Sequence, residues 1–222
     1  MVVGNGLVAN AFKDIDDKYI IFASGVSNSS NIDNNLFDRE RQLIMQYQST
    51  DKTLIYFSSI FSITSNSPYF EHKRNMENLI IENFKSYYIF RMPQIIGYGG
   101  NPNNIINLFV NKILDNDIIT IWKNSKRSII DIKDVVDIVL YIIKNNQPNS
   151  IYNVSGIELM DVNIIVDILD SILLRKSNIS LIDKDIESFI PNSYEVDKCI
   201  DALSIGKEGY TEKILRKYVK YK

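Results

Sequence analysis

Three side chains in the first third of the chain could carry out acid–base chemistry. Tyr69 and Lys73 are four residues apart at the start of an expected helix, so both project from one face. A tyrosine with its ordinary pKa of about 10 is a poor acid–base group at neutral pH, but an adjacent ammonium stabilises the phenolate. Such a tyrosine can donate a proton to a carbonyl oxygen as a hydride arrives, or remove one in the reverse direction. Ser59, at the end of an expected strand, could hydrogen-bond the same oxygen and help to stabilise an oxyanion.

The tyrosine–lysine spacing alone is not specific, because Y-x-x-x-K occurs three times in the chain. The other two pairs are Tyr194/Lys198 and Tyr218/Lys222. Only Tyr69 follows a strand that ends in Ser-Ser and a loop that ends in Ser-Pro. We therefore interpret the other two pairs as structural or solvated. The single histidine, His72, falls on another face of the helix and has no nearby ligand partners, so we expect no metal site.

A glycine turn near the N-terminus is typical of a phosphate-binding site. Gly4, Gly6 and Ala9 match G-x-G-x-x-A between an expected strand and an expected helix. The first glycine permits the tight turn, the second lets the backbone approach a pyrophosphate, and the small alanine lets helix and strand pack closely. The free N–H groups at the helix start then face the phosphates. Alone, this motif is weak, because small residues can also serve tight packing.

The acidic residue that usually binds the ribose in such a fold, about 20 residues further on, is missing. Ala23, Ser24 and Gly25 stand there instead. Either the second strand carries no acidic residue, which favours a 2′-phosphorylated cofactor, or the run YIIFASG is a later strand and the intervening strands are deleted. We favour the deletion.

The remaining elements predict an α/β chain. Apolar runs without clean alternation, each followed by a helical pattern, indicate a mostly parallel, doubly wound sheet covered on both faces. The expected strands cover residues 1–3, 19–23, 53–57, 87–90, 118–122 and 151–154. The expected helices run to about residue 12 and cover 36–48, 68–83, 104–114, 135–143, 161–174 and 211–222, with a Gly/Pro-rich loop at 91–102.

Composition excludes several classes of protein. The chain has 222 residues, 45% of them apolar, and a net charge of −2, which gives no support to a nucleic-acid or anionic-membrane partner. The lone cysteine, Cys199, excludes an internal disulfide framework and fits a reducing compartment, so we expect a cytoplasmic location. We find no apolar run long enough to span a bilayer and no signal-peptide pattern.

Taken in order, the motifs resemble the extended short-chain dehydrogenase/reductase family, of the NAD-dependent epimerase/dehydratase type. The matching segments, which extend over nearly the whole chain, are GNGLVA (4–9), FASGVSNS (22–29), IYFSS (55–59), SPYFEHK (67–73), FRMPQIIGYG (90–99), WKNSKRSIIDIKDVV (122–136) and YNVSG (152–156). The resemblance implies a Rossmann-like sheet. Residues 1–100 would form a shortened cofactor-binding and catalytic region, and residues 101–222 would complete the sheet and form a sugar-nucleotide-binding subdomain.

The resemblance also implies roles for individual residues. Ser59, Tyr69 and Lys73 would be the catalytic residues, with Lys73 also binding the nicotinamide ribose of NADP or NAD. The residues that would bind the cofactor are Gly4, Gly6, Ala9, Ala23, Gly25 and Pro93. Arg127 would bind the diphosphate of the substrate, for which a bidentate guanidinium is suited.

The chain departs from the family pattern in ways that affect the cofactor. FASGVSNS resembles the fourth strand of the family and its loop, yet it follows the first helix almost directly. We therefore interpret the second and third strands as deleted, which removes much of the adenosine-binding half. Ser59 and Tyr69 are only ten residues apart, and only one residue separates Gly4 from Gly6, both shorter spacings than the family usually has.

Within the family, Ile60 and Phe61 stand where dehydratases carry acidic residues, so a dehydratase is not expected. A weakened adenosine site suits a cofactor that exchanges, which favours an NAD(P)H-dependent reductase of a keto-sugar nucleotide, such as a 4-keto-6-deoxy sugar for surface glycans. The alternatives are a sugar-nucleotide epimerase, and a non-enzymatic nucleotide-binding protein that kept the fold. The helices at 36–48 and 68–83 could form a homodimer interface, as the resemblance suggests, or could be ordinary core helices.

Overall fold

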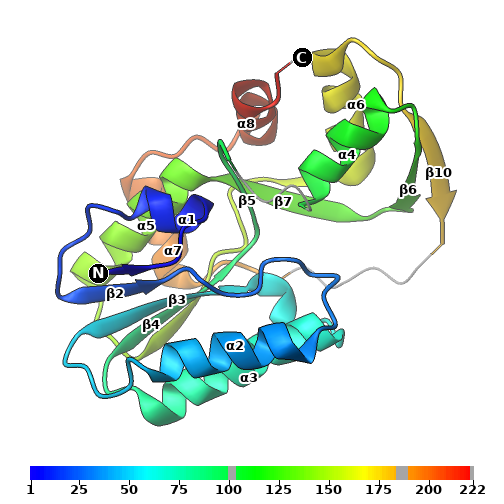
Figure 1. Cartoon of the computed structure of the whole chain (residues 1–222). Helices are drawn as coiled ribbons and strands as arrows, with labels where there is room; N and C mark the ends of the chain where they lie inside the picture. The colour runs from blue at the N-terminus through cyan, green and yellow to red at the C-terminus, as the bar shows by residue number, and fades with distance from the viewer. Residues whose placement is uncertain (100–103, 184–189, 221–222) are drawn as a thin grey trace.

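A five-stranded parallel sheet forms the centre of the molecule (Figure 1). The computed structural model describes residues 1–99, 104–183 and 190–220. The sheet has the order β1-β2-β3-β4-β8, and all of its neighbouring strands are parallel. Its strands are β1 (Val2–Val3), β2 (Tyr19–Phe22), β3 (Thr53–Ser59), β4 (Tyr87–Met92) and β8 (Ser150–Asn153). The prediction of an α/β fold with a parallel sheet is confirmed.

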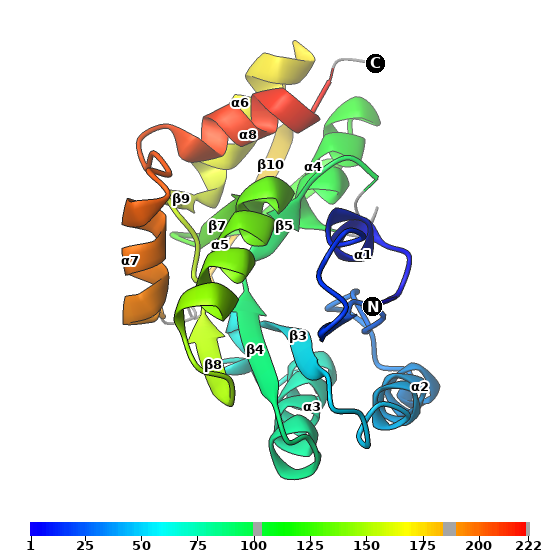
Figure 2. The same ribbon diagram turned by 90° about the vertical axis from the view of Figure 1, so that its left-hand side faces the viewer.

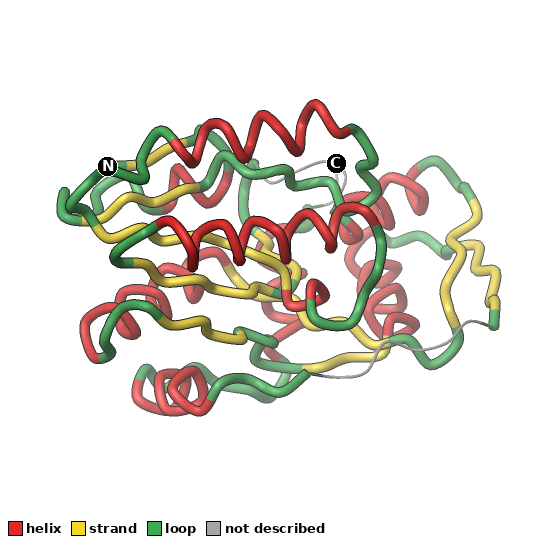
Figure 3. Tube along the Cα trace, turned by 90° about the horizontal axis from the view of Figure 1, so that it is seen from below, coloured by secondary structure: helices red, strands yellow, loops and turns green. Residues whose placement is uncertain are grey.

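Helices cover both faces of this sheet (Figures 1 and 2). One face is covered by α1 (Leu7–Ala11), α5 (Ile132–Asn145) and α7 (Tyr194–Ala202). The opposite face is covered by α2 (Asn34–Met45) and α3 (Pro68–Asn83), which lie along the strands when the molecule is viewed from their side (Figure 3). Both α2 and α3 bury apolar side chains against the sheet, so they are core helices, and the homodimer stays a prediction.

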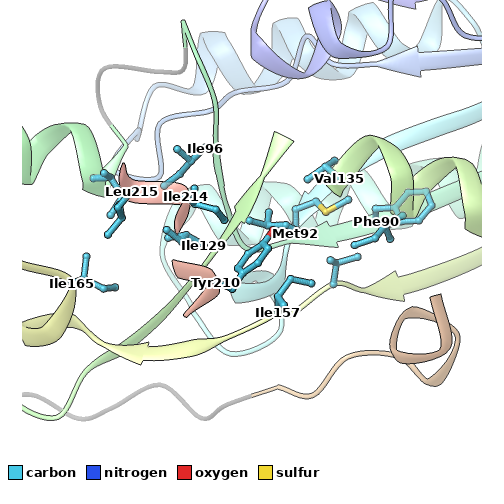
Figure 4. Packing of buried hydrophobic residues seen from close by; sticks show 14 of the residues in the cluster. Phe90, Met92, Ile96, Ile129, Val135, Ile157, Ile165, Tyr210, Ile214 and Leu215 are labelled. Atoms are coloured by element: carbon cyan, nitrogen blue, oxygen red, sulfur yellow. The ribbon is translucent and has the colours of Figure 1, made fainter. Parts of the chain in front are cut away.

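The alternating direction of side chains along the strands explains why an apolar cluster lies on each face of the sheet. Ile21, Ile55 and Phe90 point toward α5, in the larger apolar cluster. Their neighbours Ile20 and Leu54 point toward α2 and α3, in a second cluster. Figure 4 shows part of the larger cluster, which continues from Phe90 and Val135 to the side chains of the C-terminal region. Successive side chains of a strand face opposite sides, so a sheet buried on both faces needs these unbroken apolar runs.

The two connections at the N-terminal edge of the sheet have opposite hand. Both β1–α1–β2 and β2–α2–β3 step in the same direction across the sheet, yet α1 and α2 lie on opposite faces. Because such parallel connections are right-handed in about 98% of cases, one of these two departs from the rule. Within the described residues, β1 pairs only with β2 and is an edge strand. Both observations agree with the predicted deletion of strands after the first helix.

The C-terminal region adds two smaller sheets. A three-stranded sheet has the order β5-β7-β9, and a two-stranded parallel sheet joins β6 to β10. These strands are β5 (Gln94–Ile96), β6 (Ile118–Trp122), β7 (Lys126–Asp131), β9 (Leu159–Asp161) and β10 (Asn178–Ile182). The helices of this region are α4 (Ile105–Leu114), α6 (Val162–Leu173) and α8 (Tyr210–Tyr218). The predicted region boundary at residue 100 lies outside the described residues.

Most predicted elements are present, but four strands, β5, β7, β9 and β10, have no counterpart among the expected ranges. The first, β5, falls inside the expected Gly/Pro-rich loop at 91–102, where Ile95 and Ile96 pair with β7. The second, β7 itself, was not predicted as a strand. Two adjacent isoleucines, as in β5 and again in β7, are too short an apolar run to indicate a strand without its partner. The last helix ends at Tyr218, and residues 221–222 of the predicted helix lie outside the described part.

Two kinds of feature are absent from residues 1–99, 104–183 and 190–220. No helix there is long and apolar enough to cross a membrane. No group of three or more His, Cys, Asp or Glu side chains in the same ranges is arranged to hold a metal ion.

Candidate active site

The candidate catalytic residues lie where β3 ends and α3 begins. β3 ends at Ser59, a short 3₁₀ turn (η1, Ile60–Ser62) follows, and α3 starts with Pro68 at its first position. A proline is favoured there because the first N–H of a helix has no partner within the helix. The hydroxyl of Ser59 accepts a hydrogen bond from the Phe61 amide at 3.3 Å. No hydrogen bond within the described residues joins Ser59 to Tyr69.

Tyr69 and Lys73 come together as their spacing predicts. Both are buried, and the Lys73 ammonium lies 5.8 Å from the centre of the Tyr69 ring. Tyr69 packs with Val26 and Phe37 in a small apolar cluster, and Phe70 meets its ring edge-on. The phenol therefore sits in an apolar environment beside a single cation.

The charge on Lys73 is balanced by a carboxylate that sequence reasoning missed. Glu40, on α2, is fully buried and accepts a hydrogen bond from the Lys73 ammonium at 3.0 Å. The same Glu40 oxygen accepts from the Tyr56 hydroxyl at 2.7 Å. Its other oxygen accepts from the Val26 amide at 2.7 Å and lies 2.9 Å from His72 Nε2. We call these five residues the Glu40 network.

A signal for Glu40 was present in the sequence. It stands three residues after Phe37 and four before Ile44, on one face of the helix with these two apolar residues. A charged residue on an apolar face is almost never fully buried unless it is paired. His72 and Lys73 are consecutive on α3, yet both side chains reach Glu40, one at each carboxylate oxygen.

Burial and pairing shift the pKa values of these groups in opposite directions. Burial alone would raise the pKa of Glu40, but Lys73, His72 and the Val26 amide hold that pKa well below its usual range. Burial opposes the charge on Lys73, but Glu40 outweighs this effect and the pKa of Lys73 is raised. For Tyr69, burial is the largest cause and raises the pKa; Lys73 acts to lower it, and Glu40 adds to the increase.

A second buried carboxylate supports the end of β4. Glu77, on α3, accepts hydrogen bonds from Arg91 Nε at 3.0 and 3.1 Å, one to each oxygen. It also accepts from the hydroxyls of Ser58 and Ser62. Ser58 is thus committed to the sheet–helix contact, while its neighbour Ser59 borders the candidate site.

The glycine turn has a geometry that fits a pyrophosphate. Gly4 has φ +126°, and a Cβ there would lie 2.5 Å from the carbonyl oxygen of Ala23. Gly6 precedes α1 without a side-chain cap, and a Cβ there would meet nothing within 4 Å. Ala9 is buried under the turn. An open, uncapped backbone at Gly6 is a surface that a phosphate group can approach.

The end of β2 connects this turn to the Glu40 network. Ala23 donates its amide to Val3 and packs against Gly4. Two residues later, a Cβ on Gly25 would lie 2.7 Å from a carboxylate oxygen of Glu40 and 2.9 Å from the Lys73 nitrogen. Gly25 therefore leaves room for the ion pair, and the structure brings this predicted cofactor residue, in the loop after β2, next to Lys73.

Two predicted residues come from the C-terminal half of the site. Pro93 is buried between β4 and β5, close to Gly156. Arg127, on β7, stacks its guanidinium over the rings of Phe61 and Trp122 at 5.2 and 5.9 Å. Because Phe61 follows Ser59 by two residues, Arg127 lies near the end of β3, on the C-terminal side.

The other two tyrosine–lysine pairs lie elsewhere. Tyr194 is 70% exposed, with the Lys198 ammonium 5.1 Å from its ring centre. Tyr218 donates its hydroxyl to Asp131, and Lys222 lies outside the described residues. The surroundings of Tyr194 agree with its interpretation as a solvated pair.

Comparisons with known proteins agree with the predicted resemblance. Residues 50–155 match the sequence model of the NAD dependent epimerase/dehydratase family. The match confirms the resemblance to this family. It includes Ser59, Tyr69, Lys73 and Arg127 and leaves out the glycine turn. A search of curated protein sequences finds no match.

Solved structures with the same fold include several enzymes. A UDP-N-acetylglucosamine 4-epimerase from Methanobrevibacter ruminantium M1 has a TM-score of 0.70 at 16% identity, over 94% of this chain and 79% of that one. A UDP-glucuronic acid 4-epimerase from Bacillus cereus, solved with UDP-glucuronic acid and NAD, has a TM-score of 0.70 at 16% identity, over 96% and 77%. RMD from Pseudomonas aeruginosa, complexed with NADPH, has a TM-score of 0.69 at 14% identity, over 96% and 85%. These likenesses confirm the Rossmann-like fold.

Proposed function

We propose that this chain is an NAD(P)H-dependent reductase of a keto-sugar nucleotide, with Tyr69 as the proton donor. The observation that carries the proposal is the buried Tyr69 phenol beside the Lys73 ammonium. Both lie at the edge of the sheet where β3 ends and where the glycine turn follows β1. Solved relatives of the same fold bind nucleotide sugars together with NAD, which supports this class of substrate.

The residues present fit a dinucleotide cofactor at two points. The open backbone of Gly6 would hold the pyrophosphate, and Lys73 uses two of its three N–H groups, on Glu40 and Tyr56, which leaves one for a ribose hydroxyl. The bound dihydronicotinamide would supply a hydride. Tyr69 would give its proton to the carbonyl oxygen of the substrate, and Ser59 would hydrogen-bond the same oxygen. Arg127 would bind the diphosphate.

The position of β1 favours a reductase over an epimerase. β1 is two residues long and forms an edge of the sheet, so strands that would flank an adenosine are absent from the described residues on that side. A reductase must release its oxidised cofactor in every turnover, whereas an epimerase regenerates it and gains from holding it tightly. Ile60 and Phe61 occupy the turn after Ser59, which disfavours a dehydratase because neither supplies an acid or a base.

The test is oxidation of NADPH or NADH in the presence of 4-keto-6-deoxy sugar nucleotides carrying UDP, GDP or dTDP, followed at the nicotinamide absorbance. Tyr69→Phe should lower kcat by at least ~100-fold, because general acid catalysis contributes about that much. The matched control is Tyr194→Phe, the exposed tyrosine of a second Y-x-x-x-K pair, which should keep wild-type turnover. Interconversion of epimers with NAD⁺ and no reduction would instead identify the epimerase. Binding of nucleotides that is unaffected by Tyr69→Phe, without turnover, would identify a non-enzymatic binding protein.

A further inference from the structure

Glu40 is held as a carboxylate by a complete set of donors. Each of its two oxygens lies within 3.0 Å of two nitrogen or oxygen atoms, from Lys73, Tyr56, Val26 and His72. An ionised carboxylate has about four acceptor sites, so this group has no capacity left for a substrate or a cofactor. Glu40 is also 0% exposed. Glu40 therefore acts through the groups that it binds.

The group that links Glu40 to the candidate chemistry is the Lys73 ammonium. It lies between Glu40, at 3.0 Å, and the Tyr69 ring, whose centre is 5.8 Å away. An ammonium alone would stabilise the Tyr69 phenolate. Next to Glu40, the cation and the carboxylate together present almost no net charge to the phenol, so most of this stabilisation is cancelled.

The surroundings of Tyr69 strengthen this effect. Its ring packs against Val26, Phe37 and Phe70, which offer no hydrogen bond to a phenolate. Charges in such an environment are screened weakly, so the balance between Lys73 and Glu40 determines the stability of the phenolate.

In the described part of the chain, the charged or titratable groups that act on the Lys73 ammonium, besides Tyr69 itself, come from three elements. α2 contributes Glu40; α3 contributes His72, on the far oxygen of Glu40, and Glu77, whose field also reaches Lys73; β3 contributes Tyr56. Glu77 is paired with Arg91, so Glu40 is the carboxylate that binds the ammonium directly.

We propose that Glu40 is a positioning residue that neutralises Lys73 and so keeps Tyr69 protonated, as a proton donor and not a base. The proposal deepens the reductase function and rests on it. In the forward step, the carbonyl carbon would take the hydride that NAD(P)H supplies, the C=O π pair would take the Tyr69 proton, and the phenolate that remains would take a proton from water before the next turnover. Oxidation of an alcohol needs the phenolate at the start, so it should require a higher pH than reduction does.

The experiment measures the protonation of Tyr69 without substrate or cofactor. The chain is labelled with ¹³Cζ-tyrosine, the Tyr69 signal is identified by its loss in Tyr69→Phe, and its shift is followed with pH by NMR. In the wild type, Tyr69 should titrate above the ordinary tyrosine value of about 10. In Glu40→Gln, the midpoint should fall by ~1 pH unit or more, since removal of a carboxylate leaves Lys73 uncompensated.

The matched control is Glu77→Gln, which removes a second buried carboxylate that pairs with Arg91 and not with Lys73. Its Tyr69 midpoint should stay within a few tenths of a pH unit of the wild type, so a general cost of losing a buried charge would not mimic the result. An unchanged midpoint in Glu40→Gln overturns the proposal. If that variant does not fold, a wild-type midpoint below the ordinary tyrosine value overturns it instead.

The outcome is separate from that of the proposed function. A lower Tyr69 midpoint in Glu40→Gln, in a chain that turns over no keto-sugar nucleotide, would support the role of Glu40 in setting the charge at Tyr69 and reject the reductase. Turnover of a keto-sugar nucleotide with no change of midpoint would keep the reductase and reject the role of Glu40.

Discussion

The two faces of the central sheet bury different kinds of side chain. On the α5 face, Ile21, Ile55 and Phe90 meet an apolar helix whose inner side chains Val135 and Ile138 are fully buried. On the α2/α3 face, the same strands also carry Tyr56 and Ser58, which bind Glu40 and Glu77. Buried ion pairs contribute little net stability, because desolvation offsets their attraction. Both faces bury apolar side chains that stabilise the fold, but only the α2/α3 face carries the charged groups that control the charge near Tyr69.

The largest expected effect is on the free energy of unfolding, and a second substitution should partly restore it on one face and not on the other. Lys73→Met leaves Glu40 buried without its cation and should lower the free energy of unfolding by about 3–5 kcal/mol. On the other face, Ile138→Ala opens a cavity and should cost a similar ~2–5 kcal/mol. Adding Glu40→Gln should recover at least ~1 kcal/mol of the loss in Lys73→Met, because no unpaired carboxylate remains, and none of the loss in Ile138→Ala. Urea unfolding of the single and double variants measures both couplings.

Additive losses in the Lys73→Met/Glu40→Gln pair would contradict the description of the Glu40 network as one coupled unit. A coupling between Ile138→Ala and Glu40→Gln as large as the Lys73 coupling would contradict the separation of the two faces.

Most of the fold could be predicted from the sequence, because the apolar runs of β2, β3 and β4 and the helix pattern of α3 are local signals. The spacing of Glu40 with apolar residues of α2 was a signal that it is buried, but its partners could not be predicted, because they depend on how α2 packs against α3 and the sheet. Tyr69 and Lys73 were found because both lie on one helix. Whether Ser59 acts with Tyr69 stays a prediction, as does the role of Arg127.

The second prediction concerns the free energy of unfolding at acidic pH. The pKa of Glu40 is depressed in the folded chain, so its contribution to stability is present above the unfolded value of about 4.3 and is lost as pH falls toward the folded value. The free energy of unfolding should therefore fall below about pH 4, with Glu40 contributing up to ~1.4 kcal/mol per pH unit to the slope. Glu40→Gln should flatten this slope, whereas Ile138→Val, on the apolar face, should keep it. Urea unfolding between pH 3 and pH 7 in about five steps measures the slopes, and equal slopes in both variants would contradict the assignment to Glu40.

The smallest expected change in stability distinguishes two glycines at the edge of the sheet where α1 passes to the α5 face. Gly4→Ala should cost about 1–3 kcal/mol, because φ is +126° and the new Cβ meets the Ala23 carbonyl. Gly6→Ala should change the free energy of unfolding by less than about 0.5 kcal/mol, because its backbone is extended and its Cβ would meet nothing within 4 Å. That same open space is where a pyrophosphate would approach, so Gly6→Ala should weaken NADPH binding by about tenfold or more, as the second glycine of this turn admits the phosphate. Calorimetric titration with NADPH, beside urea unfolding, measures both effects, and wild-type affinity in Gly6→Ala would place the pyrophosphate away from this turn.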